Sequence, residues 1–165
     1  MHLHLEDVST IAATGYHCAF TSLLEWHGHL YLAYREAQSH GIYPPGKIVL
    51  MRSTMPPTTW EICHTFATGG DDRDPKLFDA GKYGLGIIWG TYYPRWPQAW
   101  ENPHSLQGKS TDLISHTACS RDGQVWSCTY QNYRPGYWMW SVCNTGATGP
   151  DWYYSGAYHF GGGFN

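Results

Sequence analysis

Short runs of apolar and aromatic residues, separated by turn-forming residues, recur along most of this chain. Such runs favour β-strands, because aromatic and β-branched side chains pack well on a pleated surface. We expect strands at residues 20–24, 29–34, 47–52, 60–66, 85–90, 113–120, 124–130, 138–143 and 153–160. Only residues 34–39 are compatible with a short helix. The pattern therefore predicts an all-β protein.

Turn chemistry separates the expected strands. Pro44-Pro45-Gly46, Arg121-Asp122-Gly123 and Asn144-Thr145-Gly146 are typical of tight turns, because these residues adopt the backbone angles that turns require. Residues 92–109 are different, since prolines interrupt them and they show little periodicity. We expect a long loop there, and loops of that length often carry function.

Composition narrows the possible classes. The chain has 165 residues, which is enough for one domain with a core, and only 14% of them are charged, with a formal net charge of −3. This balance gives no reason to expect nucleic acid or an anionic membrane as a partner. No run of about 18 apolar residues predicts a transmembrane helix, and the first residues do not resemble a signal peptide. The compartment stays open.

The cysteines and histidines do not predict a metal site. The five cysteines are widely spaced without a Cys-x-x-Cys pair, which argues against structural zinc. Cys119 and Cys128 could meet across a hairpin, but we favour buried free thiols. Two His-x-His pairs, at positions 2 and 4 and at 27 and 29, lack a third ligand fixed by spacing. We expect no metal and no cofactor.

A weak internal repeat links two turns. Residues 53–60 run from Ser53 to Trp60, and residues 120–126 run from Ser120 to Trp126; each segment follows one expected strand and precedes another. We call them the first and the second Ser–Trp turn. Their separation exceeds the roughly 40–50 residues of a propeller repeat, and the long loop accounts for the excess. If the repeat is real, both tryptophans should pack in equivalent places, each between strands of its own unit.

At these turns the chain resembles the sialidase-like β-propeller superfamily, whose Asp-box turn reads Ser-x-Asp-x-Gly-x-Thr-Trp. The first turn matches at Ser53, Thr59 and Trp60, with Met55 and Pro57 in place of the Asp and the Gly. The second turn keeps the Ser, the Asp and the Trp but is one residue shorter. Tyr34-Arg35-Glu36 upstream, Asp72 to Leu77 downstream and two aromatic segments near the end extend the resemblance over about residues 17–160.

The resemblance implies a β-propeller built from four-stranded blades. Residues 1–165 would form one propeller segment, with blades at about 17–70, 71–133 and 134–160. Two to three blades do not close a ring, since propellers have roughly four or more. Exposed sheet faces and edges would then drive association with further copies or with other propeller segments.

The resemblance also implies an Arg- and Asp-lined centre that recognises or hydrolyses a glycan. Several Arg side chains would bind a sugar that bears a carboxylate, because guanidinium and carboxylate groups pair in a bidentate geometry. Acidic side chains would serve the bond cleavage of an exo-glycosidase. The candidate catalytic residues are Asp72, Asp74 and Glu36, and the candidate substrate-binding residues are Arg35, Arg73 and His40.

A structural protein is the alternative. In that interpretation, Arg73 forms a buried ion pair with Asp72 or Asp74 and holds one blade to the next, because buried Asp and Arg usually require pairing. The segment would then pack with copies of itself or with other chains and catalyse nothing.

Overall fold

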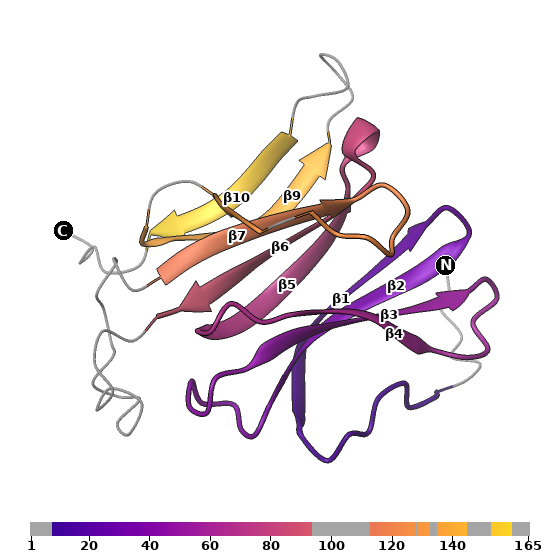
Figure 1. Ribbon diagram of the computed structural model, residues 1–165, viewed down its shortest axis with the longest axis horizontal. Coiled ribbons are helices and arrows are strands. Elements are labelled where there is room, and N and C mark those ends of the chain that lie inside the picture. The colour runs from indigo at the N-terminus through magenta and orange to yellow at the C-terminus, as the bar shows by residue number, and fades with distance from the viewer. Residues whose placement is uncertain (1–7, 94–112, 128, 133–134, 145–152, 160–165) are drawn as a thin grey trace, which may run out of the picture.

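The computed structural model is all-β, as the strand pattern predicts (Figure 1). It describes residues 8–93, 113–127, 129–132, 135–144 and 153–159. Its strands are β1 (His17–Trp26), β2 (His29–Ala37), β3 (Lys47–Thr54), β4 (Glu61–Phe66), β5 (Asp71–Asp79), β6 (Leu85–Tyr92), β7 (Leu113–Ser120), β8 (Tyr130–Asn132), β9 (Tyr137–Asn144) and β10 (Tyr153–His159). A 3-10 turn, η1 (Gly81–Tyr83), precedes β6. Within these ranges, no helix has the length and apolarity needed to cross a bilayer.

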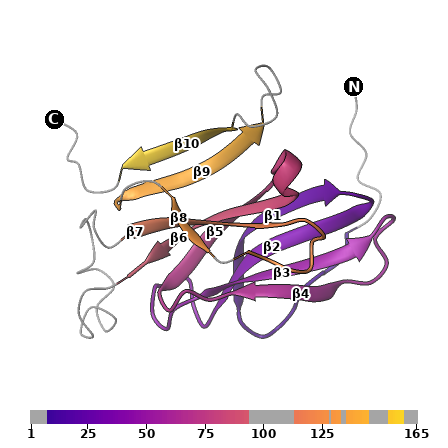
Figure 2. The ribbon, with the colours of Figure 1, turned by 45° about the horizontal axis from the view of Figure 1, so that its top comes forward.

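The strands form three antiparallel sheets that follow one another along the chain (Figure 1 and Figure 2). Sheet 1 has the order β1-β2-β3-β4, sheet 2 has the order β5-β6-β7-β8, and sheet 3 pairs β9 with β10. Each sheet lies within one of the segments expected at 17–70, 71–133 and 134–160. The sheets of the described ranges are open and form no closed ring, so the propeller stays a prediction.

Three local expectations differ from the structure. The helix expected at 34–39 is wrong, because Arg35 and Glu36 pair with β3 and this pairing overrides the local tendency. The charged run 71–79 forms β5, a strand that the apolar pattern missed. Residues 124–127 lie outside any strand, although a strand was expected over 124–130. The loop expected at 92–109 lies almost wholly outside the described residues.

The main core lies between sheet 1 and sheet 2. Its buried members come from alternate positions of the strands: Trp26, Tyr31, Ala33, Ile48, Leu50, Phe66, Leu77, Leu85, Ile87, Trp89 and Ala118. The rings of Phe66 and Trp89 meet across the two sheets, with centroids 4.8 Å apart. Burying one large apolar side chain stabilises a fold by about 1.5–3 kcal/mol, so this cluster is the principal apolar contribution to stability.

The opposite face of sheet 1 is also apolar. The buried residues Leu32, Tyr34, Val49 and Met51 alternate with those of the main core, and Trp60 and Ala12 pack against them. We call the surface made by Leu32, Tyr34, Val49 and Met51 the outer face of sheet 1. Sheet 1 is therefore apolar on both sides, as in sheets that are stacked between other layers.

Sheet 3 covers the other side of sheet 2. Trp138 on β9 is 1% exposed, and it lies where a side chain at Gly90 on β6 would be, since a Cβ added there would come within 2.6 Å of the indole. The three sheets thus form successive layers, with sheet 2 in the middle (Figure 2).

The two repeat tryptophans have different contacts, so the prediction that each packs within its own unit is wrong for Trp126. Trp60 packs on the outer face of its own sheet. Trp126 instead packs across the layers, with its ring centroid 5.3 Å from that of Phe66 on β4. Each indole nevertheless lies on the side of its sheet that faces away from the next sheet along the chain. The contacts differ because the second turn belongs to sheet 2, which packs on the preceding sheet 1. The first turn belongs to sheet 1, and no sheet precedes sheet 1 among the described residues.

A bulge recurs at the fourth residue of each sheet's first strand. The pairing register shifts around Phe20 in β1, around Asp74 in β5 and around Trp140 in β9. Phe20 and Asp74 have positive φ angles of 57° and 53°, which are uncommon for residues with a side chain. Bulges of this kind change the direction of side chains at sheet edges. The three sheets therefore share a bulge position that no common sequence motif marks.

Gly90→Ala should destabilise the layer contact between sheet 2 and sheet 3. The added methyl group overlaps the Trp138 indole, and overpacking of this kind typically costs about 1–3 kcal/mol. Urea unfolding monitored by tryptophan fluorescence measures the loss. Gly41→Ala is the matched control, because an added Cβ meets no atom nearer than 3.3 Å there. Equal stability of the two variants would contradict this packing.

Candidate functional site

Asp71, the first residue of β5, binds two arginines from different sheets. Its Oδ1 accepts hydrogen bonds from Arg35 of β2, at 2.6 Å from Nη2 and 3.2 Å from Nε. Its Oδ2 lies 2.7 Å from Nε and 2.6 Å from Nη2 of Arg73 on β5. Arg35 and Asp71 are 0% exposed. This charged centre therefore joins sheet 1 to sheet 2 from within the protein.

The loop between β2 and β3 completes the surroundings of Arg35. Its Nη1 donates to the Ser39 carbonyl at 2.9 Å, and its Nη2 donates to the Gly41 carbonyl at 2.6 Å. The backbone N–H of Gly46 donates to Asp71 Oδ1 at 2.7 Å. A Cβ at Gly46 would lie 2.5 Å from Arg35 Nε, so only glycine fits there. The guanidinium is thus satisfied by the protein itself.

The guanidinium group of Arg73 also contacts several groups of the protein besides Asp71. Its Nη2 is 3.3 Å from the carbonyl oxygen of His40, and its guanidinium carbon lies 5.6 Å and 5.9 Å from the ring centroids of Phe20 and Tyr92. The side chain of Arg73 is 13% exposed. His40 contributes its backbone to this arginine, while its imidazole contacts the rings of His17 and Phe20. Little of the Arg73 donor surface is left for a ligand.

Asp72, the residue after Asp71, has its carboxylate hydrogen-bonded within the protein. Its Oδ1 accepts from Trp89 Nε1 at 3.0 Å and from the hydroxyls of Thr68 and Thr91 at 2.7 and 2.5 Å, and its Oδ2 accepts from the Thr68 N–H at 2.8 Å. Burial raises the pKa of this carboxyl, and the hydrogen bonds oppose that shift. Asp72 anchors the main core indole of Trp89 and is itself fully buried.

Asp74 differs from its neighbours. Asp74 as a residue is 8% exposed, and its carboxyl oxygens are not among the buried polar atoms that lack a partner in the described part of the chain. Burial raises its pKa, while the positive charges of Arg73, Lys76 and Arg35 act in the opposite direction. Lys76 lies over the Trp140 ring, 5.7 Å from its centroid. Asp74 therefore occupies a bulge with a positive φ, close to the positive charges of Arg73, Lys76 and Arg35.

Glu36 lies apart from the other predicted residues. It pairs with Lys47 at 3.1 Å, on the side of β2 that carries Tyr34 of the outer face. The side chain of Lys47 is 47% exposed and that of Glu36 is 10% exposed, so the pair lies at the edge of the solvent-covered surface. The structure thus gathers Arg35, Arg73 and the His40 backbone around Asp71 and leaves Glu36 outside. Sequence reasoning missed Asp71 as the shared partner, although it begins the same acidic run.

The second Ser–Trp turn has the hydrogen bonding that its Asp residue predicts. Asp122 Oδ1 accepts from the Ser120 hydroxyl at 3.0 Å and from the N–H groups of Gln124 and Val125, both at 2.8 Å. These donors lower the pKa of Asp122. Gly123 has a φ of 73°, and a Cβ there would collide with the Tyr31 hydroxyl. The turn is therefore closed on itself and fitted against sheet 1.

The described cysteines are all free thiols. Cys18 and Cys143 are exposed, so the expectation of buried thiols is wrong for these two, while Cys63 is half-buried, with its pKa raised to about 11 by burial. Cys119 has no disulfide, which leaves the hairpin pairing unsupported; Cys128 lies outside the described residues. Among the residues described, no three His, Cys, Asp or Glu side chains gather as a metal site.

His116 and His64 are two further polar groups of the core region. The His116 ring stacks on Trp89 with centroids 5.5 Å apart, and its Nε2 lies 3.4 Å from the Tyr93 hydroxyl. Its Nδ1 is buried without a partner in the described part of the chain. The His64 ring packs on Phe66 at 4.4 Å. Burial lowers the pKa of both imidazoles, because the protonated form loses hydration.

Comparisons with known proteins do not place the chain in a family. No family model matches it, and no curated protein matches it. A crystal structure of a protein of unknown function from Dyadobacter fermentans DSM 18053 is similar, with 23% sequence identity and a TM-score of 0.49. The similarity covers 73% of this chain and 37% of that chain, so this chain spans well under half of that protein.

Asp71→Asn should strongly destabilise the fold. The amide removes the negative charge and leaves two guanidinium groups without their counter-ion, and breaking a buried pair in this way typically costs about 3–5 kcal/mol. Urea unfolding measures the difference. Glu61→Gln is the matched control, because it removes a carboxylate that is 62% exposed from an ion pair with Arg52, and such exposed pairs contribute about 0–1 kcal/mol. Loss of less than 1 kcal/mol in Asp71→Asn would contradict the structural role of this centre.

Stability should fall as the pH falls below neutrality. The folded-state pKa values of His64 and His116 are lowered, whereas an unfolded histidine titrates near pH ~6.5. The unfolded chain therefore binds protons first, and stability is lost from pH ~6.5 down to the folded-state values. The melting temperature of the wild type should fall between pH 7.5 and pH 5.5. It should fall less in the double variant that carries His64→Gln and His116→Gln. Identical drops would contradict the prediction; raised aspartate pKa values act in both proteins and cancel in this difference.

Proposed function

We propose that this chain is a structural segment of the β-propeller type, whose charged centre fastens one sheet to the next and which assembles with further sheets. The observation that carries the proposal is the hydrogen bonding of Asp71. Its two oxygens engage Arg35, Arg73 and the Gly46 N–H, and the remaining Arg35 donors engage backbone carbonyls. A centre so fully satisfied needs no ligand to explain its charges.

The layering of the sheets supports the assembly part of the proposal. Each sheet runs up and down in chain order, and the interface between sheet 1 and sheet 2 is formed by two apolar faces. The outer face of sheet 1 is apolar as well; its four residues are between 2% and 9% exposed, and Trp60 and Ala12 pack against them. The occupant that we propose for this side is a sheet of a second copy, since this chain already packs its own sheets in that way.

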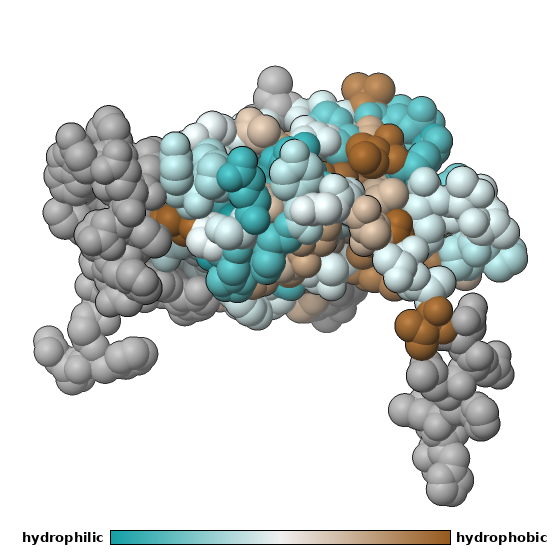
Figure 3. Space-filling model, turned by 90° about the horizontal axis from the view of Figure 1, so that it is seen from below, coloured by the Kyte–Doolittle hydropathy of each residue, from teal (hydrophilic) through white to brown (hydrophobic). Residues whose placement is uncertain are grey.

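An exposed isoleucine lies beside that face. Ile62 on β4 pairs with Met51 of the outer face and is 62% exposed. Figure 3 views the molecule from below, where sheet 1 lies in Figure 1, and shows strongly apolar residues in brown among polar residues in teal. Val8, 78% exposed, precedes β1. An exposed apolar side chain such as that of Ile62, next to an apolar face, is typical of an interaction surface.

Glycan recognition is the second candidate function, and Asp74 favours it. This carboxyl has a raised pKa, and the residue occupies a bulge with positive φ. Backbone strain of this kind is common at functional sites. Asp72 and Arg35, in contrast, have their hydrogen bonds within the protein, so the glycan hypothesis rests on Asp74.

The wild-type chain should associate in solution, and Ile62→Glu should weaken the association at least about tenfold. A charge placed in an apolar contact without a partner costs more than about 1.4 kcal/mol, which is a factor of ten in the dissociation constant. Light scattering coupled to size-exclusion chromatography measures the mass. Val125→Glu is the control, because Val125 is 74% exposed on the second Ser–Trp turn.

A wild-type monomer at tens of micromolar would overturn the assembly proposal. If that monomer also binds a sugar on a glycan array, and Asp74→Asn loses the binding while keeping its thermal stability, the second candidate function replaces it. The two outcomes are separable because Asp74 lies on β5 of sheet 2, whereas Ile62 lies on β4 of sheet 1.

A further inference from the structure

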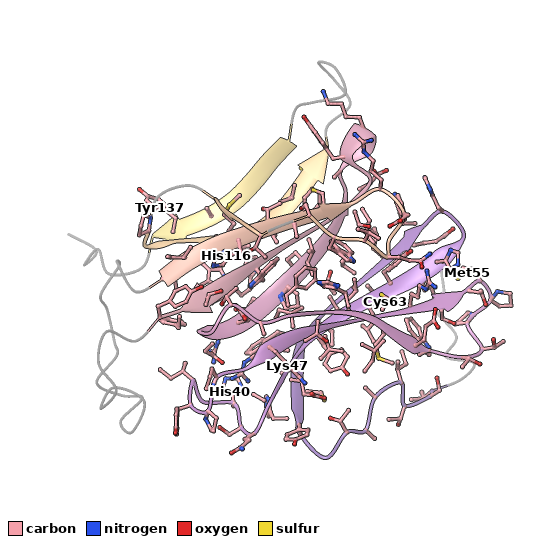
Figure 4. All side chains as sticks on the ribbon, viewed as in Figure 1. His40, Lys47, Met55, Cys63, His116 and Tyr137 are labelled. Atoms are coloured by element: carbon pink, nitrogen blue, oxygen red, sulfur yellow. The ribbon has the colours of Figure 1, made fainter. Side chains whose placement is uncertain are left out.

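A pocket lies at the end of sheet 1 where the segment before β1 meets the loop between β2 and β3 and the connection from β4 to β5. These three segments form most of its walls, and its volume is about 370 Å³. This volume is at the lower end of the range of small-molecule sites. Lys47, one of the wall residues, lies at the opposite end of sheet 1 from Met55 (Figure 4). The pocket therefore has room for one small organic molecule.

Two opposite charges lie side by side in this pocket. Glu36 of β2 and Lys47 of β3 are direct partners in the sheet, so their side chains are on the same side of it. The Lys47 Nζ is 3.1 Å from Glu36 Oε1. Arg35 precedes Glu36 on a regularly paired strand, so its side chain is on the opposite side. The sheet therefore separates this ion pair from the charged centre around Asp71.

Both charged groups line the pocket and have capacity for a ligand. The Lys47 side chain is 47% exposed, and its ammonium has three N–H donors, of which one is enough for the contact with Glu36. The Glu36 side chain is 10% exposed, and its carboxylate has a second oxygen besides the one that faces Lys47. A ligand with one positive and one negative group can thus contact both residues while their ion pair stays intact.

Other walls of the pocket are apolar. Tyr16, Pro45 and Ala67 come from the three different segments and bring an aromatic ring, a pyrrolidine ring and a methyl group. Tyr16 is 57% exposed, so part of this surface is in contact with water. Covering apolar surface with an apolar group of a ligand is favourable. The pocket thus combines a pair of opposite charges with a surface that suits a short apolar side chain.

We propose that this pocket binds a free α-amino acid with an apolar side chain. The ammonium of the ligand donates to Glu36, and its carboxylate accepts from Lys47, so that the four charges alternate in sign. A single carbon joins the two charged groups of an α-amino acid, which keeps them close enough for a pair of adjacent side chains. A peptide holds its two charged ends farther apart and does not match this spacing.

Isothermal titration calorimetry of the full chain with L-leucine tests the proposal. Leucinamide, which lacks the carboxylate, and 4-methylpentanoate, which lacks the ammonium, are the matched ligands. We expect L-leucine to bind, and each matched ligand to bind about tenfold or more weakly than L-leucine, because each loses one charge-assisted contact. A wild-type chain that does not bind L-leucine at millimolar concentration overturns the proposal, and so does equal binding of all three ligands.

Variants locate the site. Lys47→Gln and Glu36→Gln should each weaken the binding of L-leucine about tenfold or more, because each removes one of the two charges. Lys47 is the more exposed of the two, so its variant is expected to fold even if Glu36→Gln does not. Glu61→Gln, which removes a carboxylate from the ion pair with Arg52, is the control and should leave the binding unchanged. Binding that persists at full strength in Lys47→Gln would place the amino acid elsewhere on the protein and overturn the assignment.

The proposal does not rest on the assembly function, and one variant separates the two. Ile62 lies near the beginning of β4, whereas the pocket lies beyond the end of that strand. Ile62→Glu should therefore weaken the association of the chain and leave the binding of L-leucine unchanged. Loss of L-leucine binding in a folded Ile62→Glu variant would contradict the placement of the ligand in this pocket.

Discussion

The carboxylate of Asp71, held between two guanidinium groups, fixes how the first two sheets meet. A buried ion pair is costly to desolvate, and it is tolerated only when hydrogen bonds satisfy all of its members. That condition determines much of the local structure: Gly46 must be a glycine, the carbonyls of Ser39 and Gly41 must turn toward Arg35, and β5 must begin where Asp71 reaches both arginines. The contribution of this centre is to the orientation of the layers more than to the free energy of unfolding, which comes mainly from the apolar core beside it.

The same interaction explains why the charges of this chain resemble a binding site. Clustered Asp and Arg residues at the beginning of a strand are what a carboxylate-binding centre requires, and they are also what two layers require to be joined through a buried pair. Burial separates the two uses. Arg35, Asp71 and Asp72 are 0% exposed and hydrogen-bonded to the protein, whereas Asp74 is 8% exposed and occupies a bulge with positive φ.

The two Ser–Trp turns share a local motif but differ in how their serine hydroxyls are hydrogen-bonded. In both, the tryptophan lies on the same side of its sheet, and a serine stands at the beginning of the turn. Where the aspartate is present, its side chain closes the turn; where Met55 replaces it, the Ser53 hydroxyl is buried without a partner among the described residues.

The sequence by itself determined the all-β class and most of the strands, because alternating apolar residues and turn residues are local signals. It also identified the turn at Arg121-Asp122-Gly123, since turn-forming residues are a local signal as well. The strand β5 escaped detection, because its charged residues are paired by partners far along the chain. The tertiary structure alone decided that Arg35 and Arg73 share Asp71, that Glu36 lies on another face, and that Trp126 packs on the preceding sheet. Each of these depends on contacts between residues distant in sequence, whose burial and charge pairing no local pattern encodes.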